Sequence, residues 1–264
     1  MNAAWFRALY TGGVIAFLAA PLIVVAGVSV NSQRSLVFPP EGISLSWYAE
    51  LFVQSDWSSA LINSLLIAIG AGLLAVAIAL PLAVHAWATK SLLARALFGL
   101  GVAPFMLPPV ISALGFMVFW ISFGLYGNML ATVVSHGIFL VTLPLVTISI
   151  GLADLDELMI EAAQTLGADR RTVFRTVLFP MIRPYLVSGF AFAFVLSLNE
   201  YIIAYMVAGF SVETLPIKIF NSLRYGYTPI MAVVAVMFAA ISACVFGLVG
   251  WFGNLPRLLG AERT

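Results

Sequence analysis

One carboxylate and a pair of phenol rings have a spacing that could bind a cationic solute. Glu200 lies in an apolar run long enough to cross a membrane, and no other Asp or Glu lies in such a run. An ionised carboxylate facing lipid costs at least about 2 to 3 kcal/mol, so it should face a bundle interior or an aqueous path. Tyr201 and Tyr205 are four residues apart and would share a helical face, and aromatic faces bind ammonium groups. We interpret Glu200, Asn199, Tyr201 and Tyr205 as part of a solute path.

Glu200 also has a structural alternative, in which it is buried as a neutral acid or bonded to a neighbouring subunit. No Lys or Arg lies in an apolar run to pair with it. His136, beside Ser135 and Gly137 in another run, is typical of an interhelical hydrogen bond rather than of a ligand. Trp120 ends a further run, where it could line the path or belong to the aromatic belt at the membrane surface.

The elements that must position these residues are membrane-spanning helices. The 264-residue chain is 62% hydrophobic and 9% charged. A bilayer core of about 30 Å needs roughly 20 apolar helical residues. Runs of about that length cover residues 9–30, 60–85, 96–120, 129–151, 185–209 and 229–252. The sequence therefore predicts an all-α integral membrane protein, a single domain over 1–264 with six transmembrane helices. The adjacent Pro108 and Pro109 predict a kink in the third.

Charge asymmetry predicts the orientation in the lipid bilayer. The first run is longer than the roughly 7 to 15 apolar residues of a cleaved signal peptide, which is the alternative for it. Six spans place both termini on one side, and Lys and Arg are enriched on the cytoplasmic side. With cytoplasmic termini, the inside segments carry Arg7, Lys90, Arg95, Arg170, Arg171, Arg175, Arg183, Arg257 and Arg263, and the outside segments carry Arg34, Lys218 and Arg224. We therefore expect both termini in the cytoplasm.

Residues 152–184, between the fourth and fifth spans, form the only long cytoplasmic segment in this topology. The spacing predicts two short helices there. Gly167 is placed to end the first, and Asp169 is placed to cap the second, which Pro180 is expected to stop. Such a pair is typical of an attachment site for another protein, and the alternative is an amphipathic loop on the membrane surface. The apolar positions of the first helix are Leu155, Leu158, Met159, Ala162, Ala163 and Leu166.

This loop also carries a recognisable motif. Glu161, Ala162 and Ala163 are followed after three residues by Gly167, and after nine more by the segment 177–180. The pattern resembles the EAA loop of ATP-binding cassette (ABC) importer permeases, written EAA, three residues, G, nine residues, I, any residue, L, P. Val177 and Phe179 replace the usual Ile and Leu. The resemblance to these binding-protein-dependent, type I importer permeases implies that the first short helix docks on a separate ATPase subunit.

The resemblance implies a larger assembly in the bacterial cytoplasmic membrane. Its other parts would be a second permease, usually a distinct chain, two ATPase subunits that bind ATP and Mg, and an extracytoplasmic solute-binding protein. This chain has no phosphate-binding G-x-x-x-x-G-K-[ST] sequence, and its only lysines are Lys90 and Lys218. We therefore expect no cofactor in the chain itself.

Further segments are similar to the spermidine/putrescine branch of the family. Permeases for opines, iron, thiamine-like cations or amino-acid derivatives are alternatives. Polyamine permeases tend to carry two adjacent acids where this chain has Asn199 before Glu200. The similar segments are Asn63–Leu65, Ser197–Glu200, Leu215–Ile219, Leu223–Gly226 and Thr228–Pro229.

Other functional classes lack their residues. The net charge of +1 provides no basic surface for nucleic acid. The single Cys244 allows no internal disulfide or cysteine metal site. The sequence has no G-x-S-G, no H-E-x-x-H and no paired intramembrane aspartates, so we expect neither catalytic nor metal-binding residues. A secondary transporter would share the hydropathy, but it would not explain the loop motif.

Overall fold

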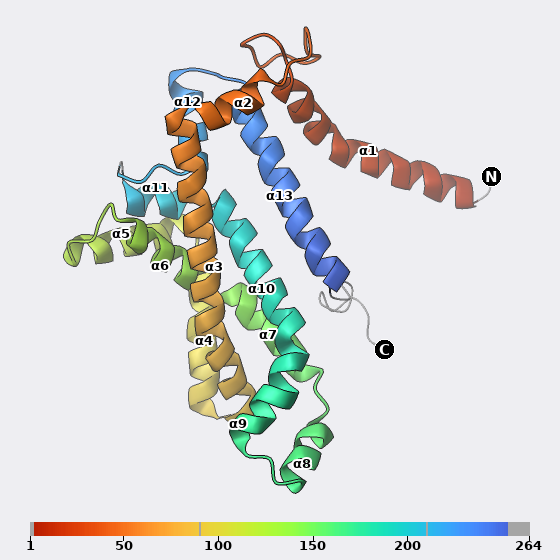
Figure 1. The fold of residues 1–264 in the computed structure, drawn as a ribbon, viewed down its shortest axis with the longest axis vertical. Helices are drawn as coiled ribbons and strands as arrows, with labels where there is room; N and C mark the ends of the chain where they lie inside the picture. Colours follow the sequence, from red (N-terminus) through yellow and green to blue (C-terminus); the bar gives the residue numbers. More distant parts are fainter. Residues whose placement is uncertain (1–2, 90, 210, 253–264) are drawn as a thin grey trace.

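The computed structural model describes residues 3–89, 91–209 and 211–252, and within these ranges the chain is a bundle of helices (Figure 1). The longest helix, α3, packs against α6, α7 and α10. The helices are α1 (Ala3–Ser29), α2 (Ser46–Val53), α3 (Ser55–Thr89), α4 (Leu92–Met106), α5 (Pro109–Ser122), α6 (Met129–Leu140), α7 (Thr142–Ala153), α8 (Glu157–Thr165), α9 (Arg170–Val173), α10 (Phe179–Asn199), α11 (Ile202–Ala208), α12 (Leu215–Tyr225) and α13 (Ile230–Phe252), with a π-helical turn, η1 (Phe174–Leu178), before α10.

Four helices are long and apolar enough to cross a membrane. They are α1, α3, α13 and the continuous helix over residues 170–199. Two further pairs pass the same test but are bent at a short break: α4 with α5 by 106°, and α6 with α7 by 42°. Counting each bent pair as one span gives the six predicted from the sequence. The all-α membrane fold is therefore confirmed, although two of the six spans are not single straight helices.

The third span is broken at its proline pair. The residue before a proline is pushed into extended conformation, and Leu107 has a ψ of 147°. Because Pro108 has no N–H, the carbonyl of Pro104 loses its helical partner, and Ser112 Oγ donates to it at 3.3 Å. The predicted kink at Pro108 and Pro109 is confirmed. The nearby hydroxyl covers the freed carbonyl, as a chain surrounded by lipid requires.

The fifth span begins and ends at different residues from those predicted. Pro180 does not stop a short loop helix, because α9, η1 and α10 continue as one helix over residues 170–199. A proline ring inside a helix clashes with the carbonyl four residues earlier. The wider π turn before it, in which the Phe179 N–H bonds to the Phe174 carbonyl, makes room for the ring. The helix then ends one residue before Glu200, so the predicted span 185–209 is two helices, α10 and α11.

Small residues allow close helix packing in the core. In a membrane, helices associate through packing and hydrogen bonds, and small side chains permit backbones to approach. A Cβ atom on Gly189 of α10 would lie 2.5 Å from the Pro144 Cα atom of α7. The face of α3 that meets the other helices is a row of alanines that are at most 1% exposed: Ala68, Ala71, Ala75, Ala79 and Ala83.

The two ends of the bundle carry different elements (Figure 1). One end holds α2, α12 and the segment that joins α1 to α2, and the other holds α8 and α9. Helix α1 contacts α13, and its N-terminal end extends away from the bundle. At the α8 end, the Tyr185 hydroxyl donates to Asp154 Oδ2 at 2.9 Å, which ties the start of the loop to α10.

The close approach of α7 and α10 predicts the effect of one methyl group. Gly189→Ala should lower the midpoint of thermal unfolding of the detergent-solubilised protein, because overpacking costs about 1 to 3 kcal/mol. Gly99→Ala is the matched control: a Cβ atom there meets nothing within 4 Å, and alanine favours the helix. Equal stability of the two variants, followed by fluorescence-detected gel filtration, would contradict this packing.

Candidate functional site

Helix α8 is a short, capped helix at one end of the molecule (Figure 1). Asp156 caps its start by accepting a hydrogen bond from the Leu158 N–H at 3.0 Å. Gly167 follows its end with a φ of +85°, a conformation that glycine adopts without strain. Asp169 then caps α9 by accepting from the Thr172 N–H at 2.8 Å. The predicted turn glycine and the predicted N-cap of the second helix are both confirmed.

The charge of the Asp169 cap is stabilised locally. Hydrogen bonds from the Thr172 side chain and backbone hold the pKa of Asp169 below its usual value. The carboxylate is therefore ionised at neutral pH and accepts the hydrogen bond that begins α9, directly after the turn at Gly167.

The surface of α8 is uncovered. None of its residues is buried. Leu158 is 67% exposed, Met159 is 51% exposed, and Leu166, directly after the helix, is 89% exposed. Glu161 and Ala162 are exposed and Ala163 is half-buried. This arrangement can bind another protein through a small apolar surface with a carboxylate at its edge.

Glu200, the second candidate, lies at the break between α10 and α11. Its Oε1 accepts the Ile203 N–H at 2.9 Å, and its Oε2 accepts the Ala204 N–H at 3.0 Å. The carboxylate thus covers the free N–H groups that begin α11. Its side chain is 11% exposed. The contacts that the structure gives Glu200 thus lie within this chain, at the start of α11 and on α6.

His136 is the residue that sequence reasoning did not connect to Glu200. Its Nε2 lies 3.2 Å from Glu200 Oε2, an ion-pair distance, although the N–H is not aligned for a hydrogen bond. Its Nδ1 lies 2.8 Å from Ser197 Oγ. The expected interhelical contact of His136 is thereby confirmed. Its partners lie on a helix far along the chain, and no local spacing could indicate them.

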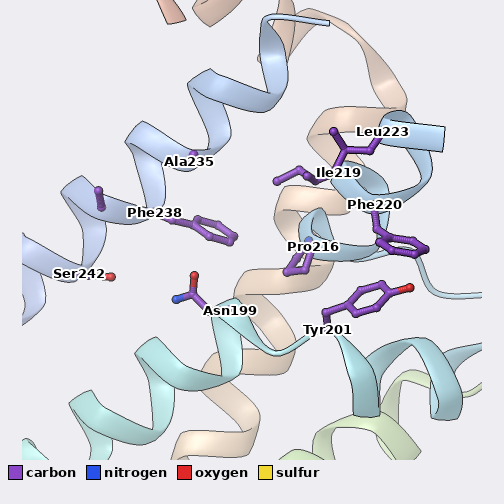
Figure 2. Close-up of a pocket in the computed structure, with 10 residues that line it drawn as sticks. Asn199, Tyr201, Pro216, Ile219, Phe220, Leu223, Ala235, Phe238 and Ser242 are labelled. Carbon is purple, nitrogen blue, oxygen red and sulfur yellow. The ribbon is translucent and has the colours of Figure 1, made fainter. Parts of the chain in front are cut away.

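The two residues that flank Glu200 line a pocket of about 500 Å³ between α10, α12 and α13 (Figure 2). Asn199 and Phe238 point into it from the end of α10 and from α13. Tyr201 closes it beside Phe220 of α12, with ring centroids 4.7 Å apart. Tyr205 stacks on Tyr201 at 5.4 Å. The lining residues are Asn199, Tyr201, Pro216, Ile219, Phe220, Leu223, Ala235, Phe238, Ala239 and Ser242.

The predicted path residues thus separate into three groups. Asn199 and Tyr201 line the pocket, and Tyr205 supports Tyr201 from behind. Glu200 is adjacent in the chain but turns its carboxylate toward α6 and α11. Trp120 lies apart from the pocket lining, and its Nε1–H donates to Ser135 Oγ at 2.8 Å.

Polar residues of α3 hold α12 over this pocket. Ser64 Oγ accepts the Leu215 N–H at 2.8 Å, and Asn63 Nδ2 donates to the Glu213 carbonyl at 3.0 Å. Two of the segments singled out in the sequence, around residue 64 and residue 215, therefore contact each other directly. Among the described residues, no cluster of three or more His, Cys, Asp or Glu side chains could hold a metal ion.

An exposed loop helix at one end of a membrane bundle and a pocket toward the other are the features of a transport subunit. Residues 77–257 match the family described as binding-protein-dependent transport system inner membrane component, and the chain belongs to this family. It is therefore a multi-pass inner membrane protein, an ABC importer permease without catalytic residues or a cofactor of its own. The family indicated by the EAA loop is confirmed.

Curated relatives cover almost the whole chain. The chain is 30% identical to the spermidine/putrescine transport system permease protein PotC of Haemophilus influenzae, over 92% of this chain and 94% of that protein. It is 32% identical to the putrescine transport system permease protein PotI of Escherichia coli, over 89% of this chain and 86% of the relative.

Solved structures show the type I importer permease fold. A bacterial ABC transporter involved in the import of the acidic polysaccharide alginate matches with a TM-score of 0.70 at 16% identity, over 94% of this chain and 95% of that chain. The MetNI methionine ABC transporter matches with a TM-score of 0.65 at 16% identity, over 80% of this chain and 100% of the other. At this identity the matches carry the fold alone.

Proposed function

We propose that this chain forms half of the translocation pathway for a small cationic solute such as putrescine or spermidine. The observation that carries the cationic class is the Glu200 carboxylate between two pocket-lining residues, Asn199 and Tyr201. Tyr201 and Tyr205 stack on each other, and Phe220 is tilted against Tyr201; these rings add aromatic faces, which attract ammonium groups. The names of the relatives, at 30% and 32% identity, support a polyamine.

The alternative solutes are those of related importers: an opine, iron, a thiamine-like cation or an amino-acid derivative. The pocket favours an organic cation over a metal ion, because its lining is mostly apolar and aromatic. The secondary transporter considered from hydropathy is ruled out, because the chain belongs to the binding-protein-dependent transport family.

Loss of the Glu200 charge should impair cation uptake. Glu200→Gln keeps the shape and removes the charge, so we expect putrescine uptake by the assembled transporter to fall about tenfold or more. The charge-conserving Glu200→Asp should retain more uptake than the Gln variant. Radiolabelled putrescine uptake, normalised to the amount of permease in the membrane, measures this. Parental uptake by Glu200→Gln would make Glu200 structural only, and a competition panel of the alternative solutes would then identify the class.

For the complete importer, we propose a second and distinct permease, two ATPase subunits and an extracytoplasmic solute-binding protein as partners. Helix α8 would dock on an ATPase subunit. Ala162 and Ala163 let a partner surface approach closely, and Glu161 offers a charge-assisted hydrogen bond at the edge. The exposure of Leu158 and Leu166 supports this, because apolar side chains outside the membrane are stabilised by a protein partner.

The turn at Gly167 should be essential for coupling. A β-branched residue is strained at a φ of +85°, whereas asparagine tolerates this region better. Gly167→Val should therefore abolish ATP-driven uptake and leave membrane insertion intact, while Gly167→Asn should keep part of it. Nothing lies within 4 Å of an added Cβ atom, so the effect would come from the backbone and not from a clash. Normal uptake by Gly167→Val would refute the assignment.

We propose that both termini and α8 face the cytoplasm, with α2 and α12 outside. Of the basic residues behind this proposal, Lys90, Arg257 and Arg263 lie outside the described residues, as do both chain ends. The remaining ones at the α8 end, including Arg170, Arg171 and Arg175, outnumber those at the opposite end.

Cysteine labelling tests this orientation. In a Cys244→Ser background, Gln33→Cys should react with an impermeant maleimide in intact cells, because residue 33 is exposed in the segment between α1 and α2. Thr176→Cys, exposed near α9, should react only after permeabilisation. The reverse pattern would invert the topology.

A further inference from the structure

The fold buries an imidazole against the carboxylate at the break in the fifth span. His136 is 1% exposed, whereas the side chain of Glu200 is 11% exposed. The Nε2 and Oε2 atoms are 3.2 Å apart, and the other imidazole nitrogen contacts Ser197 Oγ at 2.8 Å. The imidazole is thus shielded from direct contact with a solute in the pocket.

The surroundings of the carboxylate favour its ionised form. Its two oxygens accept the N–H groups of Ile203 and Ala204, and the imidazole faces one of them. An ionised carboxylate only accepts hydrogen bonds, whereas a protonated acid needs an acceptor for its own proton. The neighbours of Glu200 described above supply donors, so a charged carboxylate fits this place.

We propose that His136 is a positioning residue that determines charge selectivity through Glu200. It holds the ionised carboxylate at the break, so that the negative charge acts on the pocket lined by Asn199 and Tyr201. This inference rests on the proposed function, because it explains how that pocket would prefer cations. It also applies to any cationic solute, whether or not that solute is a polyamine.

The two imidazole nitrogens have different roles in this proposal. A serine hydroxyl either donates or accepts, so the contact of Nδ1 with Ser197 survives in the neutral and in the charged imidazole. The contact with Glu200 requires a proton on Nε2. A glutamine amide nitrogen reaches about the place of Nε2, and an asparagine amide nitrogen reaches about the place of Nδ1. His136→Gln should therefore retain the positioning of Glu200, and His136→Asn should lose it.

The electrostatic potential in the pocket can be measured without any transported solute. Asn199 is exposed and lines the pocket, so Asn199→Cys in a Cys244→Ser background places a thiol there. The assembled transporter in membrane vesicles is reacted with a trimethylammonium-ethyl or a sulfonato-ethyl methanethiosulfonate. Mass spectrometry of the labelled peptide gives both rates, each divided by the rate with a free thiol. We expect the cationic reagent to be favoured by about fivefold or more.

Variants then distinguish a positioning role of His136 from a packing role. Glu200→Gln should bring the two rates close together, and His136→Phe and His136→Asn should do the same, whereas His136→Gln should keep the parental ratio. A parental ratio in His136→Phe or His136→Asn would show that His136 only fills space. Loss of the ratio in His136→Gln, or no change in Glu200→Gln, would also overturn the proposal. If His136→Phe does not assemble, the asparagine and glutamine pair decides. Failure of putrescine uptake would refute the polyamine assignment alone and leave this ratio unaffected.

Discussion

Every break in a membrane-embedded helix leaves backbone groups that lipid cannot hydrogen-bond, and the arrangement of this molecule depends on how they are satisfied. Ser112 covers the carbonyl freed by Pro108 in the third span. Glu200 covers the N–H groups at the start of α11, and Ser64 covers the first N–H of α12. Polar side chains thus satisfy the backbone groups at each of these helix breaks.

The same constraint places the pocket. A continuous fifth helix would have buried residues 199–201 in a regular hydrogen-bonded ladder. At the break, Asn199 and Tyr201 line the pocket with α12 and α13 (Figure 2). The Glu200 carboxylate faces α6 and α11. At this break in the fifth span, the charged and largely buried Glu200 therefore lies on one side of the chain, and the pocket-lining Asn199 and Tyr201 lie on the other. The influence proposed for Glu200 on the pocket would therefore act through space, without direct contact.

The sequence predicted the elements with local signals better than those set by tertiary contacts. Hydropathy identified the spans, and the spacing of Gly167 and Asp169 identified the turn after α8, because such features depend on neighbouring residues. The prediction that Pro180 stops a helix was wrong because a π turn accommodates the proline within a continuous helix. Such a local change of helix type has no simple pattern in the sequence. The pairing of His136 with Glu200 joins residues more than sixty positions apart, so it required the fold.

The continuity of the helix through Pro180 bears on the proposed coupling between the loop and the pocket. Because α9, η1 and α10 are continuous, the turn after α8 leads directly into a helix of 30 residues that ends beside Glu200. At about 1.5 Å per residue, this helix extends roughly 45 Å, enough to connect the loop to the pocket. Asp154 and Tyr185 fasten the other end of the loop to the same helix. If α8 docks on an ATPase as proposed, a displacement there would move the end of α10, and with it Asn199, as one rigid element. A helix that stopped at Pro180 would have placed a flexible joint between the two sites, and the π turn avoids that joint while accommodating the proline.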